Sequence, residues 1–169
     1  KRTKPPKEVI PFGPECKSVA KKVVTFTADI AETNTKRPFY FSNEDKNHPL
    51  SSYASATFTD PNGTKWKSAE HFYQAAKFLD PSHAKLICDA ETASAAVLFA
   101  SMLLTKYSIR DNWDDLKYDV MLAATTAKFN NSSSLRRKLI ETSPRALVER
   151  SHDEYWGDGE NKKGENMYG

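Results

Sequence analysis

The feature that most constrains the fold is a change of pattern at Trp66. Before this residue, the run "ATFTDPNGTKW" predicts a β-hairpin, because Asp-Pro-Asn-Gly at 60–63 supplies a turn between two β-prone runs. After it, apolar side chains recur mainly at helical spacing. Strands followed by helices predict an α+β fold, a single mostly helical domain with a small N-terminal β-hairpin and sheet portion.

Capping residues divide the helical part of the chain into separate segments. Ser68, Asp80 and Thr92 each precede a helical run, and Pro81 takes the first helical position after Asp80. Serines at 132–134 precede a further run. We therefore predict helices over residues 69–79, from 81 onward, over 93–104, over 113–129, and from the serines through about residue 141.

Three shorter stretches complete the expected organisation. Residues 23–30 alternate between apolar and polar side chains, which predicts a half-buried strand. The run "PFYFS" predicts a second short strand, and "RALVERS" predicts a short strand or a helix end. Residues 153–169 hold four glycines without any periodicity, so we predict a loop there.

Length and cysteine content predict one intracellular domain. A chain of 169 residues can bury one sizeable core, and we expect a flexible lead-in over residues 1–20 and one domain over 21–169. Cys16 and Cys88 lack zinc-type spacing and make no disulfide framework, which indicates a reducing compartment, cytoplasmic or nuclear. No apolar run approaches the ~20 residues of a membrane span, so we expect neither membrane nor metal binding.

The charge is modest but unevenly distributed. A net charge of +3 does not by itself indicate a nucleic-acid partner. Residues 1–22, however, hold seven Lys or Arg against Glu8 and Glu15. Such a basic start is suited to contacting phosphates or to serving as an import signal. A solvated tail is the favoured interpretation.

The helix predicted over 69–79 carries a polar stripe. Glu70 and Lys77 are seven residues apart, which is two helical turns, so they share a face with Gln74 between them. The opposite face is apolar, formed by Phe72, Ala75, Ala76 and Leu79. A polar stripe opposite an apolar one usually faces water. The stripe is a candidate site only if another segment covers it.

Residues 149–166 are the candidate cover. They combine Glu149, Asp153 and Trp156 with several glycines. Glycines let the backbone approach a ligand closely, and a tryptophan ring can stack on a planar base. The alternative interpretation is an ordinary connecting loop whose Trp156 fills the core.

Several segments together resemble one known family. "WKSAEHFYQAAKFL", "RDNWDDLKYDVMLAATTAKF", "LVERSHDEYWGDG" and "KGENMYG" occur in the order and at the spacing found in the NADAR proteins, also called the YbiA-like superfamily. "FYFS" and "SSYA" precede them. The resemblance covers about residues 39–169, which is nearly all of the expected domain. The chain is therefore identified as a member of this family.

The resemblance implies hydrolysis of an N-glycosidic bond without a metal or redox cofactor. Family members act on ribosides whose C1 is bonded to nitrogen. The implied substrate is ADP-ribose attached to guanine in nucleic acid or nucleotides, and we expect a monomer. One alternative is a phosphoriboside of the riboflavin pathway. A second alternative is a non-catalytic module that binds ADP-ribose or NAD.

The resemblance also implies roles for individual residues. Glu70 would stabilise the positive charge that builds on the ribose, or activate water. Lys77 would donate a hydrogen bond, hold a phosphate or form a Schiff base, and Glu149 or Asp153 would act on ribose hydroxyls or as the general base. The implied substrate-binding residues are Ser42, Ser52, Tyr53, Gln74, Trp113, Lys128, Trp156, Gly157 and Asn166.

The sequence departs from the family pattern at four places. Asn112 replaces an aspartate before the tryptophan, and Asn130 stands where glutamine or glutamate is common. Met102-Leu103 replaces a Gly-Arg pair, and the chain stops at Gly169, before the closing segment with its arginine. We therefore expect a truncated C-terminal end and altered phosphate binding.

Overall fold

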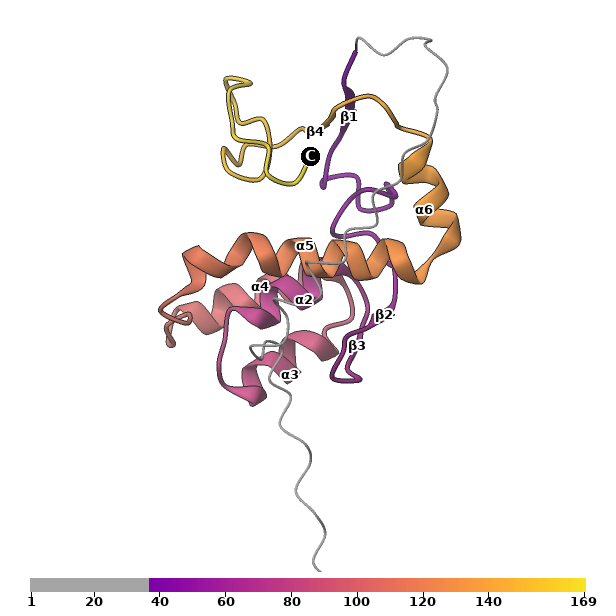
Figure 1. The fold of residues 1–169 in the computed structure, drawn as a ribbon. Coiled ribbons are helices and arrows are strands. Elements are labelled where there is room, and N and C mark those ends of the chain that lie inside the picture. Colours follow the sequence, from indigo (N-terminus) through magenta and orange to yellow (C-terminus); the bar gives the residue numbers. More distant parts are fainter. Residues whose placement is uncertain (1–36) are drawn as a thin grey trace, which may run out of the picture.

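The structure, a computed structural model, describes residues 37–169 and confirms the predicted α+β fold. The expected lead-in over 1–20 and the strand predicted over 23–30 lie outside the described residues. In chain order, the elements are β1 (Phe39–Phe41), β2 (Phe58–Thr59), β3 (Lys65–Trp66), α2 (Ala69–Ala76), α3 (Pro81–Asp89), α4 (Ala93–Leu104), α5 (Trp113–Asn131), α6 (Ser133–Ile140) and β4 (Leu147–Glu149). Helix α2 packs against α3, α4 and α5 (Figure 1).

The predicted caps begin the helices as expected. The side chains of Ser68, Asp80 and Thr92 each accept a backbone N–H from the first turn of α2, α3 and α4. Ser132 does the same for α6. Each such cap stabilises a helix start by about 1 kcal/mol. Local sequence therefore determines where these helices begin.

Helix α2 ends earlier than predicted. It stops at Ala76, and Lys77 is its C-cap, so residues 78–79 no longer follow helical spacing. As a result Phe78 is buried, with 2% of its surface exposed, while Leu79 is 68% exposed. The prediction that Leu79 belongs to the apolar face is therefore wrong. Arg110 secures this end of α2, because its backbone N–H donates to the Lys77 carbonyl at 3.0 Å.

The predicted hairpin is confirmed and is fastened to the core by its own turn. Strands β2 and β3 pair antiparallel, and Gly63 adopts the positive φ of 86° that the turn requires. Asp60 accepts a hydrogen bond from the indole N–H of Trp66 at 3.0 Å, and that indole is fully buried. The turn residue thus satisfies the buried donor of the strand that leads into α2.

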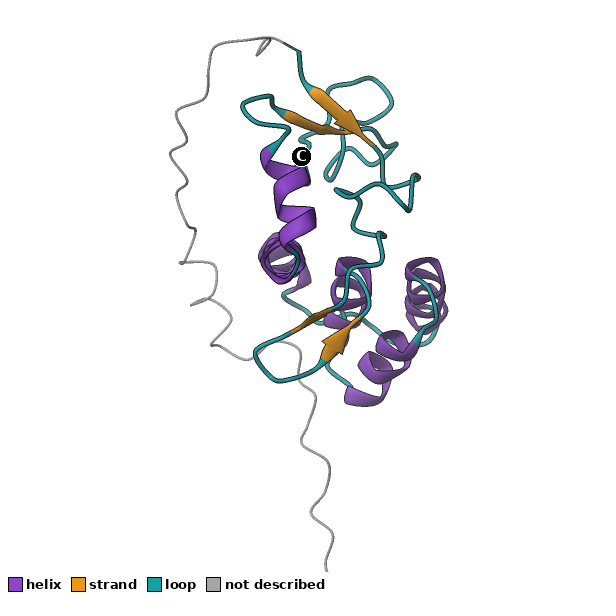
Figure 2. Cartoon of the chain, turned by 90° about the vertical axis from the view of Figure 1, so that its right-hand side faces the viewer, coloured by secondary structure: helices purple, strands orange, loops and turns teal. Residues whose placement is uncertain are grey.

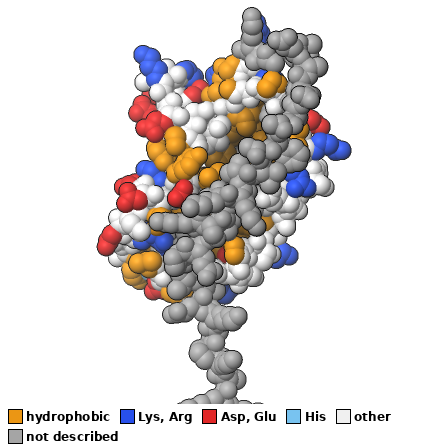
Figure 3. Space-filling model, viewed as in Figure 1, with side chains coloured by type: hydrophobic (Ala, Val, Ile, Leu, Met, Phe, Trp, Pro, Cys, Tyr) orange, Lys and Arg blue, Asp and Glu red, His pale blue; other side chains and the backbone are white. Residues whose placement is uncertain are grey.

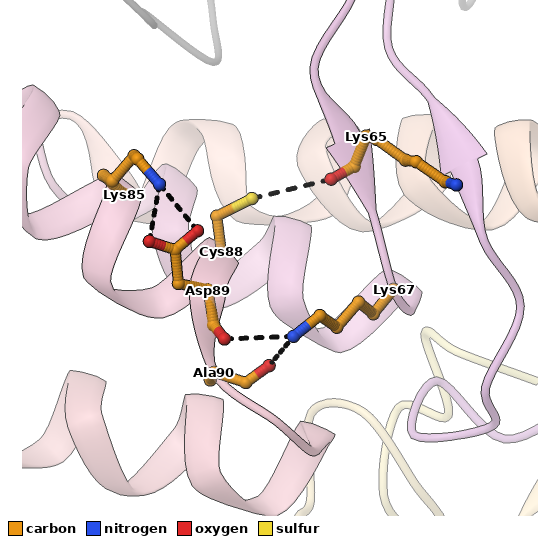
Figure 4. A network of polar contacts seen from close by, with 6 residues as sticks. All are labelled: Lys65, Lys67, Lys85, Cys88, Asp89 and Ala90. Carbon is orange, nitrogen blue, oxygen red and sulfur yellow. Dashed lines mark hydrogen bonds and ion pairs between the residues drawn. The ribbon is translucent and has the colours of Figure 1, made fainter.

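A group of polar contacts ties the end of the hairpin to helix α3 (Figure 4). The ammonium of Lys67 donates to the carbonyl oxygens of Asp89 at 3.0 Å and Ala90 at 2.6 Å. The Cys88 thiol donates to the Lys65 carbonyl at 3.6 Å. These contacts fix the segment that precedes α2, and with it the position of the helix.

Strands β1 and β4 form a second, parallel pair, in which Phe41 lies opposite Glu149. Figure 2 shows this pair at the end of the molecule opposite to the β2–β3 hairpin. The pairing confirms the strands predicted from "PFYFS" and "RALVERS". Beyond β4, residues 150–169 form neither helix nor strand, as predicted, and their loops lie beside β1 and β4 (Figure 1). The long-range pairing therefore brings Glu149 and the C-terminal loops toward the start of the domain.

The surface of the helical part carries several exposed apolar side chains. Leu98 and Met102 of α4 are 57% and 59% exposed. Figure 3 shows hydrophobic side chains among charged ones on one face of the molecule. Within residues 37–169, no helix combines the length and the apolar character that crossing a membrane requires.

Candidate active site

A cleft of about 380 Å³ lies between α2 and the C-terminal loops. All four predicted catalytic residues, Glu70, Lys77, Glu149 and Asp153, line this cleft. They arrive from α2 on one side and from β4 and the following loop on the other. Four of the predicted binding residues also line it, namely Ser52, Tyr53, Gln74 and Trp156.

The polar stripe of α2 is buried in this cleft. Glu70 is only 5% exposed and Gln74 only 7% exposed, so the interpretation as a solvated helix face is wrong. The Ser52 hydroxyl donates to Oε2 of Glu70 at 2.8 Å, and the Gln74 amide donates to Oε1 at 2.7 Å. Both carboxylate oxygens of Glu70 therefore have a hydrogen-bond donor, and the Glu70 backbone N–H donates to the Ser52 carbonyl at 3.1 Å.

Burial and the neighbouring groups have opposite effects on the pKa of Glu70. Burial raises the pKa of the Glu70 carboxyl, while the bonds from Gln74 and Ser52 and the charge of Lys77 lower it. Burial lowers the pKa of Lys77, and the Glu70 carboxylate raises it. The Lys77 ammonium also lies 5.1 Å from the centre of the Tyr73 ring. The α2 side of the cleft thus pairs a carboxyl and an amine, each partly withdrawn from water.

Glu149 lies on the opposite side of the cleft, at the end of β4. It is 2% exposed, and its backbone N–H donates to Oδ1 of Asn166 at 2.9 Å. Its Oε2 atom is buried and has no hydrogen-bond partner among residues 37–169. Burial, together with the charges of Asp153 and Glu70, raises the pKa of Glu149 to about 7, against an opposing effect of hydrogen bonding from Asn43.

Aromatic rings form the wall between these two sides. The Tyr73 ring contacts Trp156 edge to face at 5.5 Å and Trp113 at 5.1 Å. Trp156 lines the cleft, but Trp113 is not among the lining residues and is only 5% exposed. Trp113, which was predicted to contact substrate, thus packs against Tyr73 in the core instead of lining the cleft.

Two further predicted binding residues lie away from the cleft. Lys128 is 1% exposed, and its ammonium donates to the Ser51 carbonyl at 2.6 Å. Burial lowers the pKa of Lys128 to about 8. Its contact supports the Ser51-Ser52 turn that reaches Glu70, so Lys128 acts on the site through the backbone. Ser42 lines a neighbouring cavity, and its hydroxyl accepts the Glu44 backbone N–H at 3.1 Å.

Gly157 and Asn166 shape the loop side without lining the cleft. A Cβ atom at Gly157 would lie 2.2 Å from the Ser151 hydroxyl oxygen and 2.8 Å from the Glu149 carbonyl oxygen. Only glycine permits this close approach. Asn166 joins the C-terminal segment to β4, because its side-chain amide donates to the Leu147 carbonyl at 2.9 Å while its oxygen accepts from Glu149.

Sequence reasoning missed five residues that line the cleft. They are Asn43, Tyr73, Met121, Ser151 and Tyr168. Tyr73 follows Glu70 by three positions, so helical spacing already places it on the same face. Tyr168 donates its hydroxyl proton to the Leu50 carbonyl at 2.9 Å, a contact between the two ends of the described chain that no local pattern indicates.

Met102 and Leu103, which depart from the family pattern, lie outside the cleft. Both residues line a separate, mostly apolar cavity together with Leu86, Phe99 and Tyr107. Neither belongs to the cleft between Glu70 and Glu149. Within residues 37–169, no group of three or more His, Cys, Asp or Glu side chains is arranged to hold a metal ion.

Comparison with known proteins identifies the family. The NADAR domain model matches residues 38–169. The N-glycosidase YbiA of Shigella flexneri is 36% identical over 132 residues, which cover 77% of this chain and 80% of that protein. A riboflavin biosynthesis protein of Vibrio vulnificus is 34% identical over 145 residues, covering 83% of this chain and 38% of the other. The NMR structure of the Escherichia coli protein YbiA is similar with a TM-score of 0.70 and 31% identity, over 83% of each chain.

The matched region contains every residue that lines the cleft. The similarity in sequence and the similarity in structure therefore concern the same part of the chain. The chain belongs to the NADAR family.

Proposed function

We propose that this protein is an N-glycosidase that hydrolyses a ribose C1–N bond, and that its substrate is ADP-ribose attached to guanine. The observation that carries the proposal is the pair of buried carboxyl groups, Glu70 and Glu149, on opposite sides of one cleft. The name N-glycosidase given to the Shigella flexneri relative supports the reaction class.

The chemistry needs a carboxylate close to the ribose. Breaking the C1–N bond builds positive charge on the ring, and a carboxylate stabilises that charge most strongly where water is excluded. Glu70 is buried, and its oxygens are held in place by Ser52 and Gln74. Such a fixed carboxylate stabilises the developing cation without having to reorient.

The aromatic side chains of the cleft suit a planar base. Tyr53, Tyr73 and Trp156 line it together with the carboxyl groups. Aromatic rings stack on any nucleobase, a contact worth about 1–3 kcal/mol. Their position beside the carboxyl groups supports a substrate in which a base is attached directly to the ribose.

A second cavity favours a phosphorylated substrate over a free riboside. It has a volume of about 440 Å³ and shares Ser151 with the cleft. Arg150 and Lys162 line it together with the carboxylates of Glu44 and Glu160. Both cations also lie near the Asp158 carboxylate, at 3.4 Å and 3.7 Å. A ligand that passes Ser151 would bring its phosphates to these two cations.

A second candidate substrate is a phosphoriboside of the riboflavin pathway. The observation that favours it is the similarity to a riboflavin biosynthesis protein over 83% of this chain. Such a substrate is smaller, and the cleft together with part of the second cavity would accommodate it.

The test compares both substrates with one pair of variants. Single-stranded DNA carrying ADP-ribosylated guanine and a phosphoribosyl-amine substrate are each incubated with the wild type, Glu70→Gln and Glu141→Gln. Mass spectrometry then follows the release of the sugar phosphate. Glu141 is an exposed carboxylate at the C-cap of α6 and does not line the cleft, so its variant controls for loss of charge alone.

We expect ADP-ribose release by the wild type and Glu141→Gln, and release at least about 100-fold slower by Glu70→Gln. Release from the phosphoriboside alone would establish the second candidate. No release from either substrate, together with retained binding of ADP-ribose, would contradict catalysis and indicate a binding module.

A further inference from the structure

The two carboxyl groups of the cleft differ in their hydrogen bonding. Glu70 accepts a donor at each oxygen, from Ser52 at 2.8 Å and Gln74 at 2.7 Å. Oε2 of Glu149 is buried and accepts none within residues 37–169. An ionised oxygen without a donor is costly inside a protein, whereas a protonated carboxyl has less charge to satisfy. Burial raises the pKa of both carboxyl groups, but donors oppose that rise at both oxygens of Glu70, whereas hydrogen bonding from Asn43 leaves Oε2 of Glu149 without a donor among residues 37–169. Of the two, Glu149 is therefore better suited to hold a proton.

The charges around Glu149 favour the same assignment. The charge of Asp153, in the following loop, and the charge of Glu70, across the cleft, both raise the pKa of Glu149. Tyr53 and Tyr168, from the two ends of the described chain, also interact with it electrostatically. Lys77 is the cation among the lining residues. Three neighbouring carboxyl groups with one cation retain a proton more readily than isolated ones do.

The Asp153 side chain is bonded to its own loop. Its Oδ1 accepts the backbone N–H groups of Tyr155 at 2.9 Å and of Trp156 at 2.8 Å. These bonds hold the Asp153 side chain against the loop backbone and position residue 156. Asp153 therefore acts as a positioning residue of the loop, whereas Glu149 has a buried oxygen without a partner among residues 37–169.

We propose that Glu149 is the general acid that protonates the leaving base, while Glu70 stays ionised and stabilises the ribosyl cation. The assignment rests on the proposed function of the cleft. It separates two roles that the sequence leaves open, since the family resemblance alone offers Glu149 or Asp153 as a general base.

The proton balance of the step follows from this assignment. As the C1–N bond breaks, its electron pair passes to the base, and the proton on Glu149 Oε2 moves to the base. Water then forms a bond to C1, and the proton that it loses returns to the Glu149 carboxylate. The products are the protonated base and the ribose hydroxyl, and Glu149 is ready for another turnover. No oxidant or reductant is needed.

The test is the pH dependence of kcat/KM for the wild type, Glu149→Gln, Glu149→Asp and Asp153→Asn. The acid must be protonated to act, and its pKa is about 7, so wild-type kcat/KM should fall as pH rises through about 7. Glu149→Gln, which keeps the shape of the side chain, should lose at least about 100-fold and lack this decline. Glu149→Asp should restore part of the activity and the decline, which a purely structural role would not do.

Substrates that differ in their leaving group sharpen the test. A para-nitrophenolate leaving group departs from a riboside without needing a proton. If Glu149 is the acid, Glu149→Gln should therefore cleave such a riboside at a rate within about tenfold of the wild-type rate. Glu70→Gln should lose activity on both substrates. A Glu149→Gln variant that keeps the alkaline decline, or that keeps near wild-type activity on the guanine substrate, would overturn the assignment.

A measurement without turnover separates this inference from the proposed function. The infrared difference spectrum of the wild type minus Glu149→Gln should show a protonated carboxyl below neutral pH that ionises near pH 7. If that band is present while no riboside is cleaved, the proposed function fails and the protonation of Glu149 stands. If the band is absent at every pH, Glu149 is not the proton donor, whatever the substrate.

Discussion

The two sides of the cleft are built in different ways. The α2 side is a short helix with a side-chain cap at Ser68, packed against three other helices. The loop side, residues 149–169, has no helix after β4 and depends on single contacts such as those of Asn166. Accordingly, the carboxylate of Glu70 has both oxygens hydrogen-bonded, while Glu149 has a buried oxygen without a partner in the part of the chain that the structure describes.

The difference separates two kinds of catalytic demand. An electrostatic stabiliser acts best when its charge is fixed before the reaction, and a helix supplies that rigidity. A proton donor needs an environment in which its charged form is unfavourable. The loop side supplies such an environment for Glu149, and ionising Glu149 there costs folding stability.

Replacing the fixed charge should have the largest effect. Glu70→Gln removes the carboxylate while the bond from Ser52 can remain, and we expect kcat to fall by about 100- to 1000-fold. The thermal unfolding midpoint, measured alongside, should change little, because the variant retains the shape of the side chain. An equal fall of kcat in the exposed Glu141→Gln control would contradict a specific role for the Glu70 charge.

Stability should depend on pH through Glu149. Its pKa is about 7 in the fold and 4.5 as an ordinary glutamate, so the folded state holds the proton more tightly. Stability is therefore full below about pH 4.5 and lost as pH rises toward about 7, by up to about 3 kcal/mol. Urea unfolding should show Glu149→Gln losing less stability than the wild type over that range. Parallel pH curves for the two proteins would contradict the shift.

Narrowing the loop side should destabilise it. Gly157→Ala places a methyl group 2.2 Å from the Ser151 hydroxyl oxygen and 2.8 Å from the Glu149 carbonyl oxygen, so the loop must move. We expect a loss of about 1–3 kcal/mol and weaker substrate binding. Gly63→Ala is not a matched control, because Gly63 has a positive φ. Lys163→Ala, which shortens an exposed side chain of the same loop, is a better one. An unfolding free energy unchanged by Gly157→Ala would show that the close approach is dispensable.

Removing one polar contact should have a smaller effect. Asn166→Ala leaves the Glu149 backbone N–H and the Leu147 carbonyl without their partner, which we expect to cost about 1–2 kcal/mol. Because Glu149 then shifts, Asn166→Ala should lower kcat of the wild type. Adding Asn166→Ala to Glu149→Gln should lower kcat no further. Hydrogen exchange at residues 147–149 would report the loosening directly. Unchanged exchange would mean that β4 holds Glu149 without Asn166.

The sequence predicts the α2 side better than the loop side, for a physical reason. Helix caps, the hairpin turn and the helical spacing of Glu70, Gln74 and Lys77 are local, so they can be read from neighbouring residues. Whether that stripe is solvated or buried depends on the segments that cover it, which come from more than 70 positions away in the case of Glu149. Local spacing therefore left the wrong interpretation, the solvated face, as the favoured one.

Residues whose role depends on tertiary contacts were the hardest to place. Trp113 and Lys128 lie in recognisable motifs, yet one packs behind Tyr73 and the other holds the Ser51 carbonyl. Asn43, Met121 and Ser151 carry no motif of their own and reach the cleft through the packing of β1, α5 and the loop after β4. A family resemblance identifies the motif, but only packing decides which of its side chains meets the substrate.

The most direct test of the two-sided site is the single-turnover rate of ADP-ribose release from ADP-ribosylated guanine by four proteins. They are the wild type, Glu70→Gln, Glu149→Gln and the double variant. If both carboxyl groups act on one bond, each single variant should lose at least about 100-fold, and the double variant should lose far less than the product of the two losses. A wild-type rate in either single variant would contradict a site shared by the helix and the loop.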